Sequence, residues 1–322
     1  MLGRVSFAAI AASLMVVTTS AGADDVQQLA IRFGALDSVQ RPSLSPDGSK
    51  LLYIAPTTTG GRVLFIADVV AGGQPKPVIN ANNRGETLEW CRFATETRII
   101  CNVNAVHDDA GVLIVMSRLV TMNADGGDAK VLSTGETANS LGYAQSGGTI
   151  IDWTVPDKPG QVLVTRVYVP EFSTGTHIAQ TKEGVGVDLL DLTKLQRSVV
   201  ERPNEQAVRY ISDGKGTIRL FATRGNDPSG YNRNTITYLY RKAGTRGWET
   251  LVKNTDDEVF QEGEFWPVAV DSDKDVAYGF SQANGREALF SLSLDGQNIR
   301  QLILAHNQVD VDEVLRLSLI HI

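Results

Sequence analysis

Pro42-Ser-Leu-Ser-Pro-Asp-Gly-Ser-Lys-Leu-Leu-Tyr53 is the stretch of sequence that decides the fold. Within it, Pro46 presets the backbone angle for a tight turn, and Gly48 can adopt the positive φ that other residues avoid. An apolar and aromatic run, Leu51-Leu-Tyr53, follows the turn directly. We therefore predict two short antiparallel strands joined by Ser45-Pro-Asp-Gly48.

The same spacing recurs four more times, as an aromatic residue, Pro or Gly followed eleven positions later by an aromatic residue or Cys. The further pairs are Trp90/Cys101, Gly142/Trp153, Tyr210/Phe221 and Pro267/Tyr278. The repeats begin about 50 to 70 residues apart, close to the roughly 40–50 residues of one four-stranded propeller blade. Five blades are therefore expected.

A second hairpin follows each of these pairs. In the first repeat it runs from Val63–Asp68 through Gly72-Gly73 to Val78-Ile79, and in the last from Leu289–Ser293 to Leu302-Ile303. Two hairpins give four strands, and a sheet of four strands cannot bury both of its faces alone. Neighbouring sheets must therefore stack face to face, and the sequence predicts an all-β fold, a β-propeller with four-stranded blades.

The N-terminus has a different composition from the rest of the chain. Arg4 supplies a positive start, Phe7 to Val17 is an apolar run, and Ala21-Gly-Ala23 is a small-residue cleavage site. We interpret residues 1–23 as a secretory signal peptide, because the run is too short for the about 20 apolar residues of a membrane anchor. The apolar spacing in Asp25–Phe33 predicts a short helix packed on the propeller rim.

The bulk composition is that of a globular protein with a large core. Of 322 residues, 42% are hydrophobic and 21% are charged, and the net charge is −7. Phosphate binding depends on clustered Lys and Arg, and the basic residues here form no run. We therefore expect no nucleic-acid partner, and no membrane span after signal cleavage.

The two cysteines, Cys91 and Cys101, lie in the second repeat. If its hairpin turns at Thr95-Glu-Thr97, the two residues face each other across the strand pair. Facing residues lie about 4.5–5.5 Å apart at Cβ, near but above the range for a disulfide. In an oxidising compartment a cross-strand disulfide is one interpretation, and two buried, unbonded thiols are the other.

Motifs for catalysis, metal binding and cofactor binding are missing from the sequence. Gly279–Ala283 is the nearest approach to the Gly-x-Ser-x-Gly of a serine hydrolase, and it lacks the second Gly. Asp271–Asp275 alternates carboxylates as a calcium loop does, but has Val276 and Gln282 where that motif needs Gly and Glu.

The histidines outside the last six residues are His107, His177 and His306, and none lies in a nucleophile or metal motif. We interpret His107-Asp108-Asp109 as a polar loop. Walker and dinucleotide-binding glycine motifs are also missing. The sequence therefore assigns no catalytic, cofactor-binding or metal-binding residue.

The C-terminal end departs from the repeat pattern. A sixth repeat begins near Val309–Val314, but the chain continues only to Leu317-Ser-Leu-Ile-His-Ile322. That hexapeptide resembles the translation of a transposase end sequence used in preparing sequencing libraries, and we interpret 317–322 as an artefact of that kind. We expect residues 24–316 to form an incomplete propeller domain that continues, in the natural protein, beyond Arg316.

Taken together, these features resemble the N-terminal propeller of exported bacterial serine peptidases of the prolyl oligopeptidase family, which are labelled dipeptidyl aminopeptidases or acylaminoacyl-peptidases. The resemblance rests on the signal peptide, the short helix, residues 42–53, Gly72-Gly73, and Trp90-Cys…Arg98-Ile-Ile-Cys101. It implies a propeller of seven blades, of which five are present. It also implies a following α/β-hydrolase domain with Ser, Asp and His in that order, which this chain lacks.

The resemblance further implies what the chain does. The propeller is expected to act as a size filter for peptide substrates in the periplasm or outside the cell, with the missing hydrolase domain as its partner. The fragment alone is expected to be inactive. Dipeptidyl-peptidase members hold the substrate's amino terminus with adjacent glutamates, and this chain has no Glu-Glu pair; Glu262-Gly-Glu264 is not a substitute.

Two other functions are compatible with parts of the sequence. A non-catalytic, TolB-like periplasmic propeller that binds proteins explains the signal peptide and Ser45-Pro-Asp-Gly48 equally well. A lyase or lactonase propeller is a third alternative, disfavoured because such sites gather metal-binding residues and the sequence shows no such cluster. Fold by itself decides none of these.

Overall fold

The computed structural model describes residues 23–57, 60–81, 85–133, 135, 137–226, 229–256 and 263–314. The signal peptide predicted at 1–23 lies outside the described residues except for Ala23, as does the artefact predicted at 317–322. The chain forms two compact units, Met1–Asp37 and Ser38–Ile322. The first contains α1 (Ala23–Phe33), so the predicted N-terminal helix is confirmed, while its packing on a rim stays a prediction.

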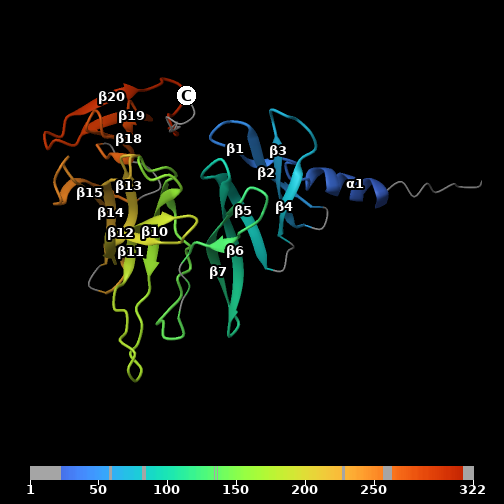
Figure 1. The fold of residues 1–322 in the computed structure, drawn as a ribbon. Helices are drawn as coiled ribbons and strands as arrows, with labels where there is room; N and C mark the ends of the chain where they lie inside the picture. The colour runs from blue at the N-terminus through green and yellow to red at the C-terminus, as the bar shows by residue number, and fades with distance from the viewer. Residues whose placement is uncertain are drawn as a thin grey trace, which may run out of the picture. The chain divides into compact units, whose positions relative to one another are not determined.

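The second unit is built from five four-stranded antiparallel sheets, each formed by four consecutive strands (Figure 1). Each sheet is a simple meander in which every strand pairs with the next one along the chain. This is the blade topology of a β-propeller. The predicted fold class, an all-β chain of five four-stranded blades, is confirmed for the described residues.

The bounds of the strands are as follows. The first sheet comprises β1 (Gln40–Leu44), β2 (Lys50–Pro56), β3 (Arg62–Asp68) and β4 (Lys76–Ala81). The second comprises β5 (Glu86–Phe93), β6 (Arg98–Asp109), β7 (Val112–Asn123) and β8 (Lys130–Val131). The third comprises β9 (Ile150–Asp152), β10 (Gln161–Tyr168), β11 (Gly184–Asp191) and β12 (Arg197–Asn204). The fourth comprises β13 (Ala207–Ser212), β14 (Ile218–Asn226), β15 (Asn232–Tyr240) and β16 (Glu249–Thr255). The fifth comprises β17 (Trp266–Asp271), β18 (Val276–Ala283), β19 (Arg286–Ser293) and β20 (Arg300–Leu304).

The turn between β1 and β2 forms as the sequence predicts. Gly48 adopts φ +71°, and its N–H donates to the Ser45 carbonyl at 2.8 Å. The buried Ser45 hydroxyl donates to Asp47 Oδ1 at 2.6 Å, and the Lys50 N–H donates back to that hydroxyl at 2.9 Å. The Ser45 hydrogen bond, followed by those from Ser49, holds the pKa of Asp47 well below its usual range. The turn is thus fixed by its own side chains.

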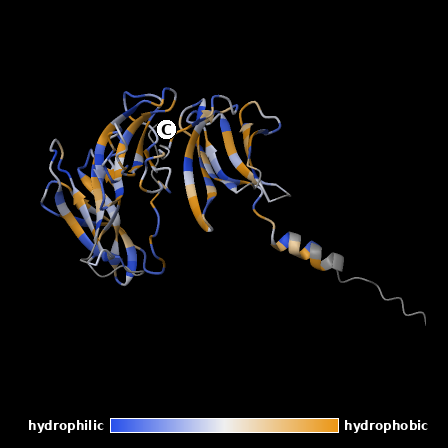
Figure 2. Cartoon of the chain, turned by 90° about the horizontal axis from the view of Figure 1, so that it is seen from below, coloured by the Kyte–Doolittle hydropathy of each residue, from blue (hydrophilic) through white to orange (hydrophobic). Residues whose placement is uncertain are grey.

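The core consists of apolar layers between neighbouring sheets, and β10 shows how one strand serves two of them. Val162 and Val164 pack toward the second sheet, against residues such as Ile100 and Leu119. Leu163 points to the opposite face and packs toward the fourth sheet, against Ile218. Successive side chains of a strand alternate between faces, so a strand buried on both faces is apolar throughout. Figure 2 shows such hydrophobic segments within the strands of the sheets.

The predicted register is wrong in the third blade. The pair Gly142/Trp153 does not bracket a hairpin, because the first strand, β9, begins only at Ile150 and its partner, β10, begins at Gln161. The preceding residues pair with the second sheet instead: the Ser117 N–H donates to the Gln145 carbonyl at 2.7 Å, and the Gly147 N–H donates to the Ser117 hydroxyl at 2.9 Å. A tertiary contact thus replaces the local hairpin.

Two further expectations are corrected. His107-Asp108-Asp109 is not a loop but the end of β6, which pairs with β7 over its whole length and forms a hairpin longer than its neighbours (Figure 1). Among the described residues, 305–314 contain no strand, so the sixth repeat expected at Val309–Val314 is not seen there. Instead the Val311 N–H donates to the Glu287 carbonyl at 3.0 Å, which holds this segment against β19.

Candidate functional site

The three histidines are held in separate local contacts. The His107 ring lies 5.6 Å from the Tyr143 ring, between centroids. His177 Nε2 lies 3.2 Å from Glu171 Oε2. His306 Nδ1 accepts hydrogen bonds from the N–H groups of Gln308 and Val309 at 3.2 and 3.3 Å. None of these described contacts pairs a histidine with a serine hydroxyl, as a nucleophile and its base would be paired.

Ser281 is the serine in the sequence nearest to a hydrolase motif, and it is structural. Its side chain is buried on strand β18, as predicted for a strand rather than a nucleophile turn. Its hydroxyl donates to the Glu264 carbonyl and accepts from Arg300 Nη1, the latter at 3.2 Å. With both capacities used and no route to solvent, this hydroxyl joins β18 to the segment before β17.

The acidic segment Asp271–Asp275 is a hairpin turn between β17 and β18. Asp271 Oδ1 accepts from the N–H groups of residues 273 and 274 at 3.0 and 3.1 Å. Asp273 pairs with Lys215 at 2.6 Å and Asp275 with Arg219 at 2.5 Å. These carboxylates are engaged with backbone and cations rather than turned toward one point. Among the described residues no group of three or more His, Cys, Asp or Glu converges as a metal site.

Glu264 belongs to Glu262-Gly-Glu264, which does not substitute for the adjacent glutamates of dipeptidyl peptidases, and its role is also structural. Its carboxylate accepts from the Thr255 N–H at 2.5 Å and from Trp266 Nε1 at 3.3 Å, and the residue is 9% exposed. Glu262 lies outside the described residues.

Cys91 and Cys101 are paired in the register of β5 and β6, and their sulfurs are bonded at 2.04 Å. Both side chains are buried in the core layer between the first and second sheets. Of the two interpretations left open by the sequence, the geometry is that of the disulfide, and we predict that this bond forms in an oxidising compartment.

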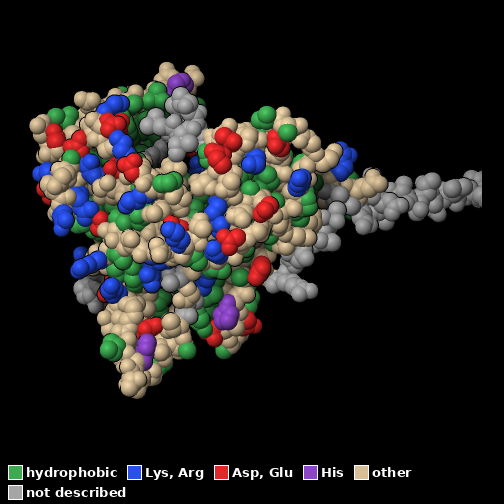
Figure 3. All heavy atoms as spheres, viewed as in Figure 1, with side chains coloured by type: hydrophobic (Ala, Val, Ile, Leu, Met, Phe, Trp, Pro, Cys, Tyr) green, Lys and Arg blue, Asp and Glu red, His purple; other side chains and the backbone are tan. Residues whose placement is uncertain are grey.

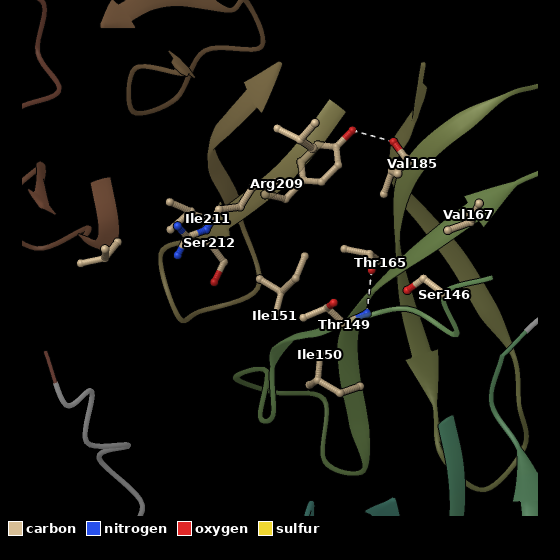
Figure 4. Close-up of a pocket in the computed structure, with 13 residues that line it drawn as sticks. Ser146, Thr149, Ile150, Ile151, Thr165, Val167, Val185, Arg209, Ile211 and Ser212 are labelled. Atoms are coloured by element: carbon tan, nitrogen blue, oxygen red, sulfur yellow. Dashed lines mark hydrogen bonds between the residues drawn. The ribbon is translucent and has the colours of Figure 1, made fainter. Parts of the chain in front are cut away.

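The candidate binding site is a pocket of about 370 Å³ among the third, fourth and fifth sheets (Figure 4). It is called the Tyr210 pocket here. It is lined by Ser146, Thr149, Ile150, Ile151, Thr165, Val167, Val185, Val208, Arg209, Tyr210, Ile211, Ser212 and Val268. Its walls come mainly from the first strands of these sheets: β9, β13 and, through Val268, β17. Aliphatic side chains dominate, as in most small-ligand sites.

Hydrogen bonds between strands fix the polar groups of the Tyr210 pocket (Figure 4). The Tyr210 hydroxyl donates to the Val185 carbonyl at 2.8 Å, joining the fourth sheet to the third. The Thr149 N–H donates to the Thr165 hydroxyl at 2.7 Å. The buried Ser212 hydroxyl donates to Asp152 Oδ1 at 2.5 Å, while Asp152 Oδ2 accepts from the Gly216 N–H at 3.0 Å. The pocket is therefore a pre-formed cavity.

Tyr210 is a donor and not a base. Burial, with a smaller contribution from the negative charge of Glu201, raises the pKa of Tyr210 to about 12. The phenol therefore stays protonated at neutral pH and keeps its hydrogen bond to Val185. Arg209, the one charged residue of the lining, lies close enough to Tyr238 to oppose the rise in the pKa of Tyr238 that burial causes.

The chemistry of the Tyr210 pocket is that of binding. The Ser212 hydroxyl is committed to a buried aspartate, the Ser146 hydroxyl accepts from the Gly148 N–H, the tyrosine is a protonated donor, and the lining contains no histidine. Sequence reasoning did not find this site, because its residues come from three repeats and carry no motif. The only available signal was the polar Arg209 within the apolar strand Ala207–Ser212.

Figure 3 shows Lys and Arg interspersed with Asp and Glu on the face that it presents. No helix among the described residues is both long and apolar enough to cross a bilayer.

No protein-family model matches the chain, and no curated protein matches it in sequence. Solved structures do resemble it. TolB from Acinetobacter baumannii aligns with a TM-score of 0.35 and 11% identity over 81% of this chain and 53% of that one. A puromycin-hydrolyzing peptidase from Mycobacterium tuberculosis aligns at 0.38 and 13% over 79% of this chain and 34% of that one. Prolyl oligopeptidase B from Galerina marginata aligns at 0.44 and 10% over 84% of this chain and 34% of that one.

The alignments differ in how much of the other protein is matched. The chain spans about half the length of the Acinetobacter TolB and about a third of each of the two peptidases. Both kinds of protein weighed from the sequence, TolB and peptidases, are thus among the similar structures.

Proposed function

We propose that this chain is the substrate-admitting propeller of an exported serine peptidase of the prolyl oligopeptidase type, with a peptide as its ligand. The observation that carries the proposal is the Tyr210 pocket: a ligand-sized cavity among first strands, built from aliphatic and hydrogen-bonded groups, without a nucleophile and base. Such a cavity can hold and orient a peptide but cannot break its bonds.

In this proposal, binding and catalysis belong to different domains. An α/β-hydrolase domain, supplied by sequence that follows the propeller, performs acyl transfer through a serine activated by histidine. The propeller limits which peptides reach that serine and forms one wall of the cavity. The sequence resemblance around Ser45-Pro-Asp-Gly48 and the Cys91–Cys101 hairpin supports this family. Export is part of the proposal, because residues 1–23 have the composition of a signal peptide.

Peptide binding and hydrolysis by the chain can be measured separately. Titration with short apolar peptides should give saturable binding, and fluorogenic oligopeptides should not be hydrolysed. Val208→Trp, which fills the Tyr210 pocket, should abolish this binding. Val131→Trp changes an equally exposed valine outside the pocket and should leave it unchanged.

Two outcomes would contradict the proposal. Hydrolysis by the purified chain, or labelling of one of its serines by a fluorophosphonate, would place catalytic groups within it. Reading the gene beyond codon 316 on an independently prepared library should show further blades, a Gly-x-Ser-x-Gly element and a later His. A reading frame that stops once the propeller is complete would contradict the peptidase proposal.

A TolB-like, protein-binding propeller is the second candidate, and one observation favours it. The end of the long β6–β7 hairpin exposes Val112, Leu113 and Val115, at 63%, 69% and 60% of their surface. Exposed apolar clusters of this kind often mark protein contacts. If this candidate is correct, replacing all three with Ser will abolish capture of a periplasmic protein by the chain, and no fluorophosphonate-reactive serine will be found in the whole gene product.

A further inference from the structure

A second, larger cleft lies on the first three sheets, apart from the Tyr210 pocket. Its volume is about 1150 Å³, and no residue is shared between the two linings. It is called the arginine cleft here, and its defining residues are Arg41, Leu44, Trp90, Arg92, Phe93 and Trp153. They come from β1, from the end of β5 and from the residue that follows β9.

The walls of the arginine cleft are apolar and aromatic. Trp90 and Trp153 pack edge to face with 5.9 Å between ring centroids, and both are half-buried. Leu44, at the end of β1, exposes 54% of its surface. Aromatic pairs of this kind present a large, rigid contact surface and lose little conformational entropy when they bind. Apolar side chains of a ligand can therefore be buried here.

Arg92 is held in place over one of these aromatic rings. Its guanidinium carbon lies 4.8 Å from the centroid of the Trp153 ring. Stacking fixes the guanidinium plane, while the N–H donors at its edge remain available to a carboxylate. Arg92 thus combines an ordered position with an unused set of donors.

Arg41 occupies a strained position in the same cleft. Its φ is +50°, in the left-handed region that residues other than Gly seldom adopt. It lies in a bulge, where the β1–β2 register shifts between Gln40 and Ser43. Bulges of this kind redirect a side chain and occur often beside binding sites.

Among the described residues, neither Arg41 nor Arg92 makes a hydrogen bond or a carboxylate contact through its guanidinium, and the contact of Arg92 is the stacking on Trp153. Several other arginines are paired; for example, Arg98 lies 2.8 Å from Asp128 and Arg241 lies 2.7 Å from Glu201. In a chain with a net charge of −7, the arginine cleft thus brings together two arginines that no described carboxylate pairs.

Asp47 also lines the cleft, but it forms no ion pair with either arginine. Asp47 accepts hydrogen bonds from the hydroxyl of Ser45 and from the backbone N–H and hydroxyl of Ser49, at 2.6 to 2.9 Å. Its oxygens are thus committed to the β1–β2 turn. The cleft keeps two unused cationic groups for its ligand.

We propose that the arginine cleft binds acidic peptide segments in which Asp or Glu side chains alternate with apolar or aromatic ones. The carboxylates pair with Arg41 and Arg92, and the apolar side chains pack against Trp90, Trp153 and Leu44. Two guanidinium groups offer donors to two carboxylates, which a segment with several acidic side chains supplies and a single chain terminus does not. The inference deepens the proposed function by naming a class of peptide that the propeller would select.

Binding of labelled peptides to the full chain tests this directly. The probe is a fluorescein-labelled, C-terminally amidated octapeptide that alternates Glu with Phe, and its matched control replaces every Glu with Gln. Fluorescence anisotropy at low ionic strength should show at least about tenfold tighter binding of the Glu peptide. Arg41→Gln and Arg92→Gln should each weaken that binding by about tenfold and leave the Gln peptide unaffected.

Arg246→Gln is the matched control variant, because Arg246 is also exposed and also has no partner among the described residues, but lies outside the cleft. It should not change the affinity. Trp153→Leu removes the ring on which Arg92 is stacked and should weaken binding of the Glu peptide. Circular dichroism and thermal melting of each variant identify those that fail to fold, and Arg41→Lys and Arg92→Lys then serve as milder replacements.

Several results would overturn the inference. Equal affinity for the Glu and Gln peptides, or binding unchanged in both Arg variants, would show that the peptide carboxylates do not pair with Arg41 and Arg92. Tight binding only when the amidated end is replaced by a free carboxylate would assign the cleft to a peptide terminus. Displacement of the probe by a fatty acid but not by an acidic peptide would assign it to a lipid.

These outcomes are separate from those that test the proposed function. If the complete gene encodes no hydrolase and the cleft still selects Glu peptides, only the peptidase proposal fails. If the complete protein is a peptidase and Arg41→Gln and Arg92→Gln change nothing, only the present inference fails.

Discussion

Cys91 lies directly opposite Cys101 in the pairing of β5 and β6, with 4.0 Å between their Cα atoms and their sulfurs bonded. The pair is buried between the first and second sheets, and Cys91 also lines the arginine cleft. We predict that Cys91→Ala/Cys101→Ala lowers the free energy of unfolding by about 2–3 kcal/mol, as expected for a loop of this length. Urea unfolding under non-reducing conditions measures this.

Reductant provides the control for this prediction. It should lower the midpoint of the wild-type protein and leave that of the double variant unchanged. Titration of two free thiols in denatured, unreduced protein that was purified from an oxidising compartment would show that the bond does not form.

Asp188 is fully buried in the third sheet, between the guanidinium groups of Arg197, at 3.1 Å, and Arg166, at 3.7 Å. Asp188→Ala leaves two cations without their anion in a low-dielectric environment. The expected loss is about 3–5 kcal/mol in the free energy of unfolding. Asp273→Ala removes an exposed aspartate from its pair with Lys215 and should stay close to wild type. Similar urea midpoints for the two variants would contradict this assignment.

From the raised pKa of Tyr210, we predict that the free energy of unfolding falls at alkaline pH. The pKa of Tyr210 is about 12 in the folded chain, above its ordinary value of 10, so the folded state holds the proton more tightly. Its contribution is therefore fully present below pH 10 and is lost as the pH rises through 12, by about 2–3 kcal/mol. Urea unfolding at pH 8 and pH 11 measures the decline.

Tyr210→Phe isolates this effect. The free energy of unfolding of this variant should be about 1 kcal/mol lower at pH 8, because the hydrogen bond to Val185 is missing. It should then fall less steeply than that of wild type toward pH 11. Tyr53→Phe, at a half-buried ring stacked on Phe65, is the comparison and should keep the wild-type slope. Identical slopes for wild type and Tyr210→Phe would show that another group controls the alkaline transition.

Gly148 lies between Ser146 and Thr149, which both line the Tyr210 pocket. Its φ is +101°, and a Cβ built there would lie 2.3 Å from the Thr165 carbonyl oxygen. Gly148→Ala should cost at least about 3 kcal/mol and displace the hydrogen bond between Thr149 and Thr165.

Gly244 is the matched position, with φ +73° and open space around it. Gly244→Ala bears only the backbone strain and should cost about 1 kcal/mol. Thermal melts and peptide affinity of both variants check this. If Gly148→Ala is no worse than Gly244→Ala, the close contact with Thr165 is not what requires glycine.

Local signals in the sequence predicted most of the strands. Pro46 and Gly48 fix a turn through backbone preferences that need no neighbour, and the facing positions of Cys91 and Cys101 follow from counting residues around Thr95–Thr97. The third blade was predicted wrongly, because Ser117 of the second sheet binds the Gln145–Gly147 segment through hydrogen bonds that no local pattern shows. The β6–β7 hairpin was also underestimated at His107–Asp109, because polar residues are tolerated where a strand pair extends into solvent.

The sequence by itself determined that the chain forms four-stranded blades with one short helix, because turn residues and alternating apolar strands act over a few positions. Only the tertiary structure decided where the two candidate binding sites lie. Arg41, Arg92 and Trp153 belong to three repeats, and so do Val185, Tyr210 and Val268; each is unremarkable in its own strand. They form sites because stacking the sheets to bury their apolar faces brings these distant strands together, and that packing is a property of the whole chain.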